Sequence, residues 1–137
     1  MEKVSLRQGA WTNDAAIRLA SNLDPKDPTY SILELQREVE QGTSWLYEVY
    51  QGSAFLGWIV LFTDDYGGGR ELIVQNGAAV VRDQNILKLV MAAVEPYARQ
   101  LGCQSIRTHI AKSKSGLARK FKELGFRDAE IVLRKSI

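Results

Sequence analysis

The feature that most constrains this chain is a strand that runs directly into a helix, because it fixes part of a fold and creates a place where charge can bind. Within Glu71–Phe126 the pattern predicts, in turn, a strand to Val81, a helix that opens at Arg82–Asn85, a strand over Cys103–Ala111 and a short closing helix. The start of a helix presents unpaired backbone N–H groups and the positive end of a dipole. This junction is therefore predicted to bind an anion, although it lacks the glycines expected there.

The first half of the chain predicts one short strand, two helices and a hairpin. The strand covers Lys3–Arg7, one helix follows Thr12, a second covers Ser31–Gln41, and the second strand of the hairpin is Ala54–Phe62. Gly57 lies inside that strand and predicts either a bulge or a place where another group approaches the backbone closely.

Further elements complete the order. They are a flexible loop over Asp64–Gly69, the strand Arg70–Val81, a helix over Gly116–Leu124 and a last strand at Ile131–Leu133. The order is β-α-α-β-β-β-α-β-α-β, and its strand–helix–strand crossover predicts one parallel pair in a mostly antiparallel sheet. We therefore expect a single α/β (α+β) domain over residues 1–137, with a mixed sheet and helices on both faces.

The composition is that of an ordinary globular protein, with 137 residues, 45% hydrophobic and 25% charged. A chain of this length buries a core without disulfide or metal staples. Cys103 is the only cysteine, which excludes an internal disulfide and a cysteine-based metal site, and no metal is expected. No apolar run reaches 18 residues and the N-terminus has no signal-peptide pattern, so we expect a cytoplasmic protein without a membrane partner.

The charge is unevenly distributed along the chain. Residues 1–81 carry 6 Lys and Arg against 11 Asp and Glu, whereas residues 82–137 carry 12 against 5. Basic residues also cluster around the closing helix: Lys112, Lys114, Arg119, Lys120 and Lys122. This basic half is either a solvated surface or a face toward phosphates, nucleic acid or an acidic partner.

Four short strings occur in a characteristic order over nearly the whole chain. They are Leu6–Ala10 followed by Asp14, Gln51-Gly52 followed by Leu56–Leu61, Ala98–Cys103 and Phe121–Phe126. Together they resemble the GNAT superfamily of N-acetyltransferases. The resemblance implies a GNAT-like fold and acyl-CoA-dependent transfer of an acetyl group, from acetyl-CoA to an amine of a small molecule or protein.

The resemblance also implies where the acyl-CoA lies. In that family it occupies a splay between the strands that are here Arg70–Val81 and Cys103–Ala111, with its pyrophosphate on amides at the start of the intervening helix. The cofactor-binding residues that this implies are Val80, Val81, Arg82, Asp83, Gln84, Asn85, Leu87 and Lys88, with Lys114 as a further phosphate ligand.

The phosphate motif departs from the family pattern. Counting back from Gly102 places Arg82 at the family's arginine, and Asn85 and Leu87 at its two small residues. Glycine is favoured where a backbone approaches a pyrophosphate closely. Asn85 tolerates a left-handed backbone, but Leu87 fills the phosphate volume unless its side chain turns into the core. The alternative is that this segment is simply a helix start packed on a sheet.

The candidate catalytic residues are Glu71 and His109. Glu71 resembles the position from which some relatives supply a general base, and His109, the only histidine, lies beside the expected splay. The alternative for a lone strand histidine is a packed or surface residue. Many relatives have a tyrosine as general acid at the position of Phe121, which has no proton to donate.

Two functions follow from the resemblance and its departures. The first is an N-acyltransferase with acyl-CoA and an amine acceptor as its partners. The second is a catalytically degenerate GNAT-fold protein that serves as a binding or structural component, for example of a bacteriophage particle, where it would be virion-associated.

Overall fold

The computed structural model of the protein describes residues 3–23, 31–110 and 114–137, so the end of the strand predicted over Cys103–Ala111 lies outside the described residues. The elements are β1 (Val4–Gln8), α1 (Asn13–Ala20), α2 (Ile32–Gln41), β2 (Trp45–Gln51), β3 (Ala54–Tyr66), β4 (Gly69–Ala79), α3 (Ile86–Gln100), β5 (Ser105–Thr108) and α4 (Ser115–Glu123). The five strands form one sheet in the order β1-β2-β3-β4-β5. Neighbours are antiparallel except β4 and β5, which are parallel as predicted.

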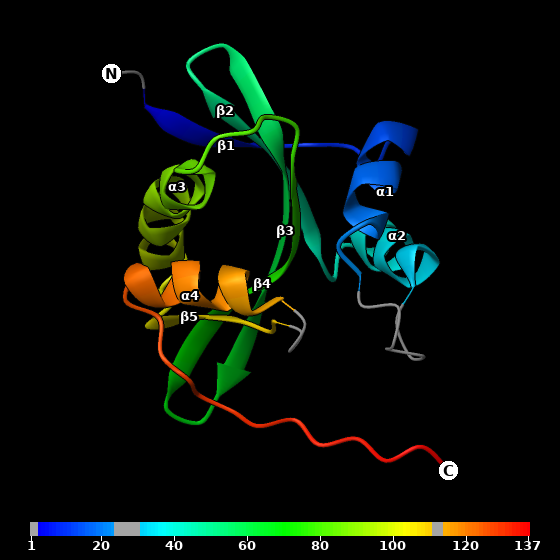
Figure 1. The fold of residues 1–137 in the computed structure, drawn as a ribbon, viewed down its shortest axis with the longest axis vertical. Coiled ribbons are helices and arrows are strands. Elements are labelled where there is room, and N and C mark those ends of the chain that lie inside the picture. Colours follow the sequence, from blue (N-terminus) through cyan, green and yellow to red (C-terminus); the bar gives the residue numbers. More distant parts are fainter. Residues whose placement is uncertain (1–2, 24–30, 111–113) are drawn as a thin grey trace.

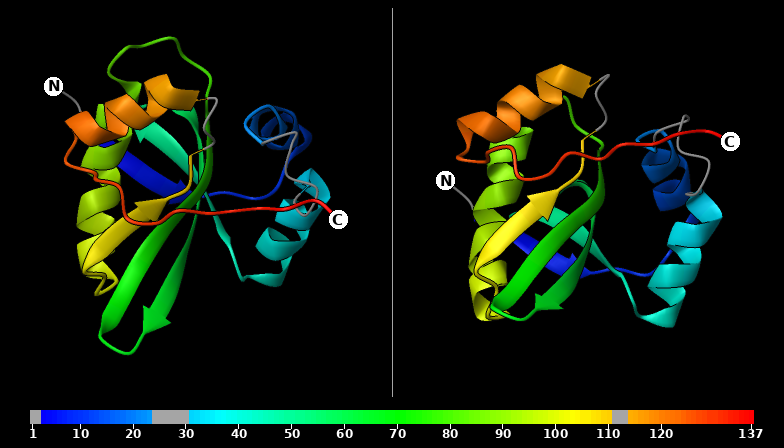
Figure 2. Two further views of the ribbon diagram at one scale, coloured as in Figure 1. Left: turned by 60° about the horizontal axis from the view of Figure 1, so that its bottom comes forward. Right: turned by 90° about the horizontal axis from the view of Figure 1, so that it is seen from below.

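Helices cover both faces of the sheet (Figures 1 and 2). On one face, α3 and α4 pack through Met91, Val94, Ala98 and Phe121 onto strand residues that include Leu61 and Leu72. On the other, which we call the α1–α2 face, Ala15, Leu19 and Leu35 pack against Leu46 and Val60. Alternate strand residues thus enter two separate cores, as the period of two along a strand requires.

The predicted helix ends on the α1–α2 face are confirmed. The side chain of Thr12 accepts a hydrogen bond from the Ala15 amide at 3.1 Å, and that of Ser31 accepts one from the Glu34 amide at 3.3 Å. Gly42 ends α2 in a left-handed conformation, with φ of 81°. Local capping chemistry therefore sets these boundaries.

Both predictions for Gly57 are confirmed. Val49 pairs with Gly57 while Tyr50 pairs with Phe55, so one residue of β3 bulges out of the ladder. Gly57 has φ of +147°, and a Cβ placed on it would lie 2.1 Å from the carbonyl oxygen of Ala78. The backbone of β4 therefore approaches β3 where only glycine leaves room.

The prediction of a flexible loop over Asp64–Gly69 was wrong. Strand β3 continues to Tyr66, which pairs with Gly69, so the connection to β4 is a two-residue turn of Gly67 and Gly68. Paired strands satisfy the backbone groups that a loop would leave to water. The ion pair between Arg70 Nε and Asp65 Oδ1, at 2.6 Å, spans the same turn.

The predicted helix start at Arg82–Asn85 was also wrong, because α3 begins at Ile86. The side chain of Asp83 accepts a hydrogen bond from the Asn85 amide at 2.8 Å, and its carbonyl accepts one from the Ile86 amide at 3.1 Å. Such aspartate turns compete with helical hydrogen bonding. Residues 80–85 therefore form a loop between β4 and α3.

The last predicted strand, at Ile131–Leu133, is absent, so the predicted order loses its final β. Ile131 and Leu133 are 87% and 89% exposed, and residues 125–137 contain no helix or strand. The segment is joined to β5 through side chains, with Arg107 donating to Glu130 at 3.0 Å, and it then extends away from the sheet (Figure 1). A short apolar run without backbone pairing to a neighbouring strand does not become a strand.

Candidate functional site

The parallel pair of β4 and β5 separates partway along its length. Its ladder runs from Glu71 opposite Ser105 to Val74 opposite Thr108, and the Thr108 hydroxyl donates to the Val74 carbonyl at 3.0 Å. Strand β4 continues to Ala79 without a β5 partner. We call the region beside this unpaired half of β4, residues 75–79, the splay.

A bulge in β4 marks the point where the splay begins. Asn76 pairs with Val60 and Val74 pairs with Leu61, so Gln75 is an extra residue opposite β3. A bulge bends its strand and increases the local twist. Gln75 directly follows the last rung with β5, so the bulge coincides with the end of the parallel ladder.

The end of α1 lies beside the unpaired half of β4. The side-chain amide of Asn22 donates to the Gly77 carbonyl, and that of Asn76 donates to the Leu19 carbonyl at 3.1 Å. Lys114 donates from Nζ to the Asn22 carbonyl at 3.5 Å. The structure therefore places Lys114, which was predicted to bind a phosphate, beside the end of α1.

The loop after β4 exposes a short run of backbone amides. The Val80 amide donates to the Leu56 carbonyl at 2.9 Å, which fixes the start of the loop on β3. Residues 81–85 are exposed, and the N–H groups of residues 81–84 donate to no other described residue. Asn85 makes no side-chain cap on α3, and the first turn of α3 has no acidic residue. These amides suit an anion.

Leu87 packs against the core of the protein. It is half-buried, and Ile86 packs against the same core. Arg82 and Lys88 are exposed, and neither forms an ion pair with a described residue. The loop and the first turn of α3 therefore combine free amides with two cations, Arg82 and Lys88, without the glycines.

Glu71 belongs to a network around Arg107 on the α1–α2 face. The Arg107 guanidinium lies 3.4 Å from a Glu71 oxygen, 3.5 Å from Asp64 and 3.0 Å from Glu130. The other Glu71 oxygen accepts a hydrogen bond from the Ser105 hydroxyl at 2.8 Å. Both oxygens of this predicted base thus already have partners.

His109 joins the same network at its exposed rim. Its Nε2 lies 3.5 Å from an oxygen of Glu130, and its side chain is 59% exposed. The structure therefore links Glu71 and His109 through Arg107 and Glu130. This network is built around the paired part of the ladder, so Glu71 precedes the splay by four residues.

Phe121 occupies the position that the resemblance assigns to a general acid. It is 6% exposed and its ring packs edge-on against Phe126, with 5.0 Å between the ring centroids. This position therefore contributes to packing, and proton donation from it is excluded by its chemistry.

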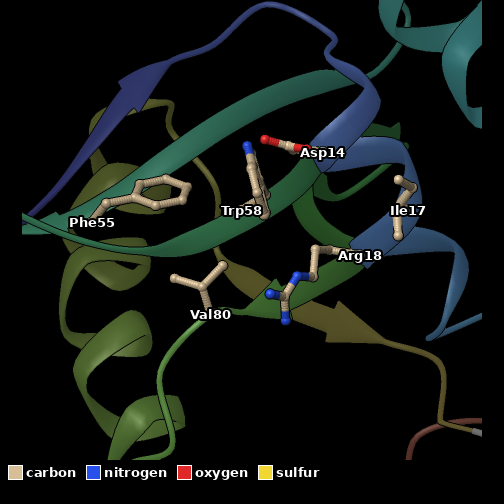
Figure 3. A pocket seen from close by; sticks show the side chains of 6 residues that line it. All are labelled: Asp14, Ile17, Arg18, Phe55, Trp58 and Val80. Atoms are coloured by element: carbon tan, nitrogen blue, oxygen red, sulfur yellow. The ribbon is translucent and has the colours of Figure 1, made fainter.

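Two of the cavities formed by the described residues open on the α1–α2 face. The larger, of about 520 Å³, lies between α1 and the ends of β3 and β4 (Figure 3), and its lining residues are Asp14, Ile17, Arg18, Phe55, Trp58 and Val80. The smaller, of about 300 Å³, is lined by Glu38, Thr43, Ser44, Phe62 and Gln75. Val80 joins the larger cavity to the amide loop, and Gln75 joins the smaller one to the splay.

A hydrogen-bonded carboxylate lines the smaller cavity. Glu38 Oε2 accepts from Gln75 Nε2 at 2.7 Å and from the Ser44 hydroxyl at 3.2 Å, and that hydroxyl lies 2.8 Å from Gln75 Oε1. These residues come from α2, the following loop and β4. Sequence reasoning missed them, since no local pattern connects positions 31 to 37 residues apart.

The described part of the chain contains neither a cluster of metal-ligating residues nor a helix able to span a membrane. Its residues contain no group of three or more His, Cys, Asp or Glu placed to hold a metal ion. None of its helices is both long and apolar enough to cross a bilayer. Burial raises the pKa of the Cys103 thiol, partly offset by Arg70, which suits a structural cysteine.

Comparisons with known proteins identify the fold. No family model and no curated protein sequence matches this chain. An aminoglycoside N-acetyltransferase, AAC(6')-Iy in complex with CoA, matches with a TM-score of 0.65 and 18% identity, over 100% of this chain and 96% of that one. A second, meta-AAC0020 from an uncultured soil metagenomic sample, in complex with trehalose, gives 0.63 and 14% over 98% and 95%.

The same fold occurs in a protein with a different description. A transcriptional regulator from Bacillus halodurans C-125 matches with a TM-score of 0.68 and 18% identity, over 98% of this chain and 99% of that one. At these identities the matches establish the fold alone. The predicted mixed sheet with helices on both faces is confirmed.

Proposed function

We propose that this protein, which has the fold of the GNAT acetyltransferases, transfers an acetyl group from acetyl-CoA to an amine of a small molecule or protein. The observation that carries the proposal is the splay, where β4 leaves β5 after Val74 at a bulge and ends in a loop of free amides. The known AAC(6')-Iy structure, which contains CoA, supports the choice of donor.

The residues present fit a CoA pyrophosphate despite the missing glycines. The N–H groups of residues 81–84 supply donors, and Arg82 and Lys88 supply positive charge. Leu87 packs against the core, and residues 81–85 are exposed. Asp83 opposes the phosphate charge, but its carboxylate is occupied by the Asn85 amide.

Calorimetric titration with acetyl-CoA tests the proposal. A ligand at 100 times its Kd stabilises the folded protein by about 2.7 kcal/mol, so a thermal shift accompanies the heat of binding. We expect the double variant Arg82→Ala, Lys88→Ala to raise Kd at least tenfold, about 1.4 kcal/mol, because both cations flank the amide loop. Arg37→Ala, an exposed cation on α2, is the matched control and leaves Kd unchanged.

A wild-type protein that gives neither heat nor thermal shift with millimolar acetyl-CoA refutes the transferase. The second candidate, a binding or structural component, is favoured by Phe121 at the acid position and by the exposed basic side chains of Arg119, Lys120 and Lys122 on α4. Loss of binding to nucleic acid or an acidic partner on neutralising Arg119 and Lys120, with no acetyl-CoA binding, supports that candidate.

A further inference from the structure

The larger cavity on the α1–α2 face combines two opposite charges with two aromatic rings. Its volume of about 520 Å³ lies within the range of small-molecule pockets, roughly 300–1,000 Å³. The charged residues, Asp14 and Arg18, belong to α1, and the rings of Phe55 and Trp58 belong to β3. Of its described lining residues, only Val80 is also part of the proposed acetyl-CoA site. The chemistry of this cavity is therefore mostly its own.

The two charges are available to a ligand. Asp14 and Arg18 are four residues apart on α1, a spacing at which an acid and a base commonly pair. Neither forms an ion pair with another described residue. Instead, Asp14 extends toward Trp58 and Arg18 toward Val80 (Figure 3). Asp14 lies in the first turn of the helix and Arg18 in the last, where the helix dipole stabilises each charge.

The aromatic wall of the cavity is held in place and only partly covered. Phe55 and Trp58 pack edge to face, with 4.9 Å between their ring centroids and 77° between their planes. Both residues are half-buried, and Trp58 also packs against the core of the α1–α2 face. The rings thus offer a fixed apolar surface on which a further ring packs at little cost in side-chain ordering.

This lining selects a ligand that carries both charges. Asp14 repels a ligand with only a negative charge, and Arg18 repels a ligand with only a positive charge. A ligand with an ammonium group and a carboxylate pairs with both side chains, and an aromatic body adds contact with the rings of β3. A free aromatic amino acid has these three parts in one small molecule.

We propose that this cavity binds a free aromatic amino acid. Its carboxylate lies on Arg18, whose planar guanidinium donates two parallel hydrogen bonds to such a group. Its ammonium group lies on Asp14, and its ring packs against Phe55 and Trp58. The site does not depend on the transferase function, because it uses α1 and β3 and not the splay.

Calorimetry with matched probes tests this assignment. The probes are L-phenylalanine, L-tyrosine and L-tryptophan, and then two analogues of the tightest binder, one without its carboxylate and one without its ammonium group. For phenylalanine these analogues are phenethylamine and 3-phenylpropionate. The variants are Arg18→Gln and Asp14→Asn, with Asp14→Glu to keep the charge. The controls are Arg37→Gln and Glu40→Gln, at exposed positions on α2, and a thermal melt of each variant checks folding.

We expect wild type and both controls to bind the amino acid about tenfold or more tightly than either analogue, because each analogue leaves one charge without its partner. Arg18→Gln is expected to bind the amino acid about tenfold or more weakly while its affinity for the analogue without a carboxylate does not fall. Asp14→Asn is expected to show the converse, with no loss for the analogue without an ammonium group, and Asp14→Glu is expected to bind better than Asp14→Asn.

Three results overturn the inference. They are no binding of any of the three amino acids to wild type at millimolar concentration, equal wild-type affinity for the amino acid and its analogues, and unchanged amino-acid affinity in Arg18→Gln. If Arg18→Gln and Asp14→Asn instead weaken acetyl-CoA binding, the cavity belongs to the cofactor site and the inference also fails. Absence of acetyl-CoA binding to wild type refutes the transferase alone, and amino-acid binding that depends on both charges still supports this site.

Discussion

Replacing Gly57 with alanine is predicted to disturb both the stability of the sheet and the proposed acetyl-CoA site. The added Cβ would lie 2.1 Å from the Ala78 carbonyl oxygen and 2.9 Å from the Ala79 Cα. Both contacts are with backbone, so no side-chain rotation relieves them. The two strands must move apart at the end of β4, next to Val80, whose amide donates to Leu56.

The magnitude follows from two separate costs. A non-glycine residue at φ of +147° costs about 1–3 kcal/mol in backbone strain. Forcing strands apart around an extra methyl group costs about 1–3 kcal/mol more. We therefore expect Gly57→Ala to lower the free energy of unfolding by about 2–6 kcal/mol.

Urea denaturation followed by circular dichroism measures this loss. The matched control is Gly67→Ala in the turn between β3 and β4, where no atom lies within 4 Å of the added Cβ and φ is not positive. That control is expected to change stability by less than about 0.5 kcal/mol. If Gly57→Ala is as stable as wild type, the close approach of β3 and β4 is not a feature of the folded protein.

Three further predictions concern side-chain contacts around the sheet. Tyr97→Phe removes the hydrogen bond between the hydroxyls of Tyr47 and Tyr97 and leaves Tyr47 without that partner. We expect the variant to lose about 1–3 kcal/mol of folding stability, measured by thermal melt. A loss of stability below about 0.3 kcal/mol contradicts the pairing. Burial and this bond raise the pKa of Tyr47 above its usual 10, so the folded state retains a proton that the unfolded state loses. Wild-type stability is therefore expected to fall as pH rises above about 10, and less steeply in the variant. Arg107→Met leaves Glu130 and two other carboxylates without their shared cation. We expect the variant to lose about 1–2 kcal/mol of folding stability, and this loss shrinks in high salt. Faster proteolysis of the C-terminal segment in the variant checks the prediction, and an unchanged rate refutes the anchoring role of Arg107.

Elements whose signals are local were predicted well. Thr12, Ser31 and Gly42 act on amides and carbonyls within a few residues, so their sequence neighbours contain the information needed. The start of α3 was missed because the turn at Asp83 competes with the helix, and the balance depends on the attachment of Val80 to β3. The last strand was predicted wrongly because an apolar run becomes a strand only when a partner strand pairs with it.

The candidate site likewise has one part that the sequence indicated and one part that it did not. The amide loop after β4 is contiguous in the chain, so Arg82, Lys88 and their neighbours could be proposed from the resemblance to the GNAT family. The tertiary structure decided the rest: Leu87 packs into the core, and the bulge at Gln75 meets Glu38 from a helix 37 residues earlier. Periodicity and capping depend on interactions within a few residues, whereas the bulge and the cavity depend on how segments far apart in the sequence pack together.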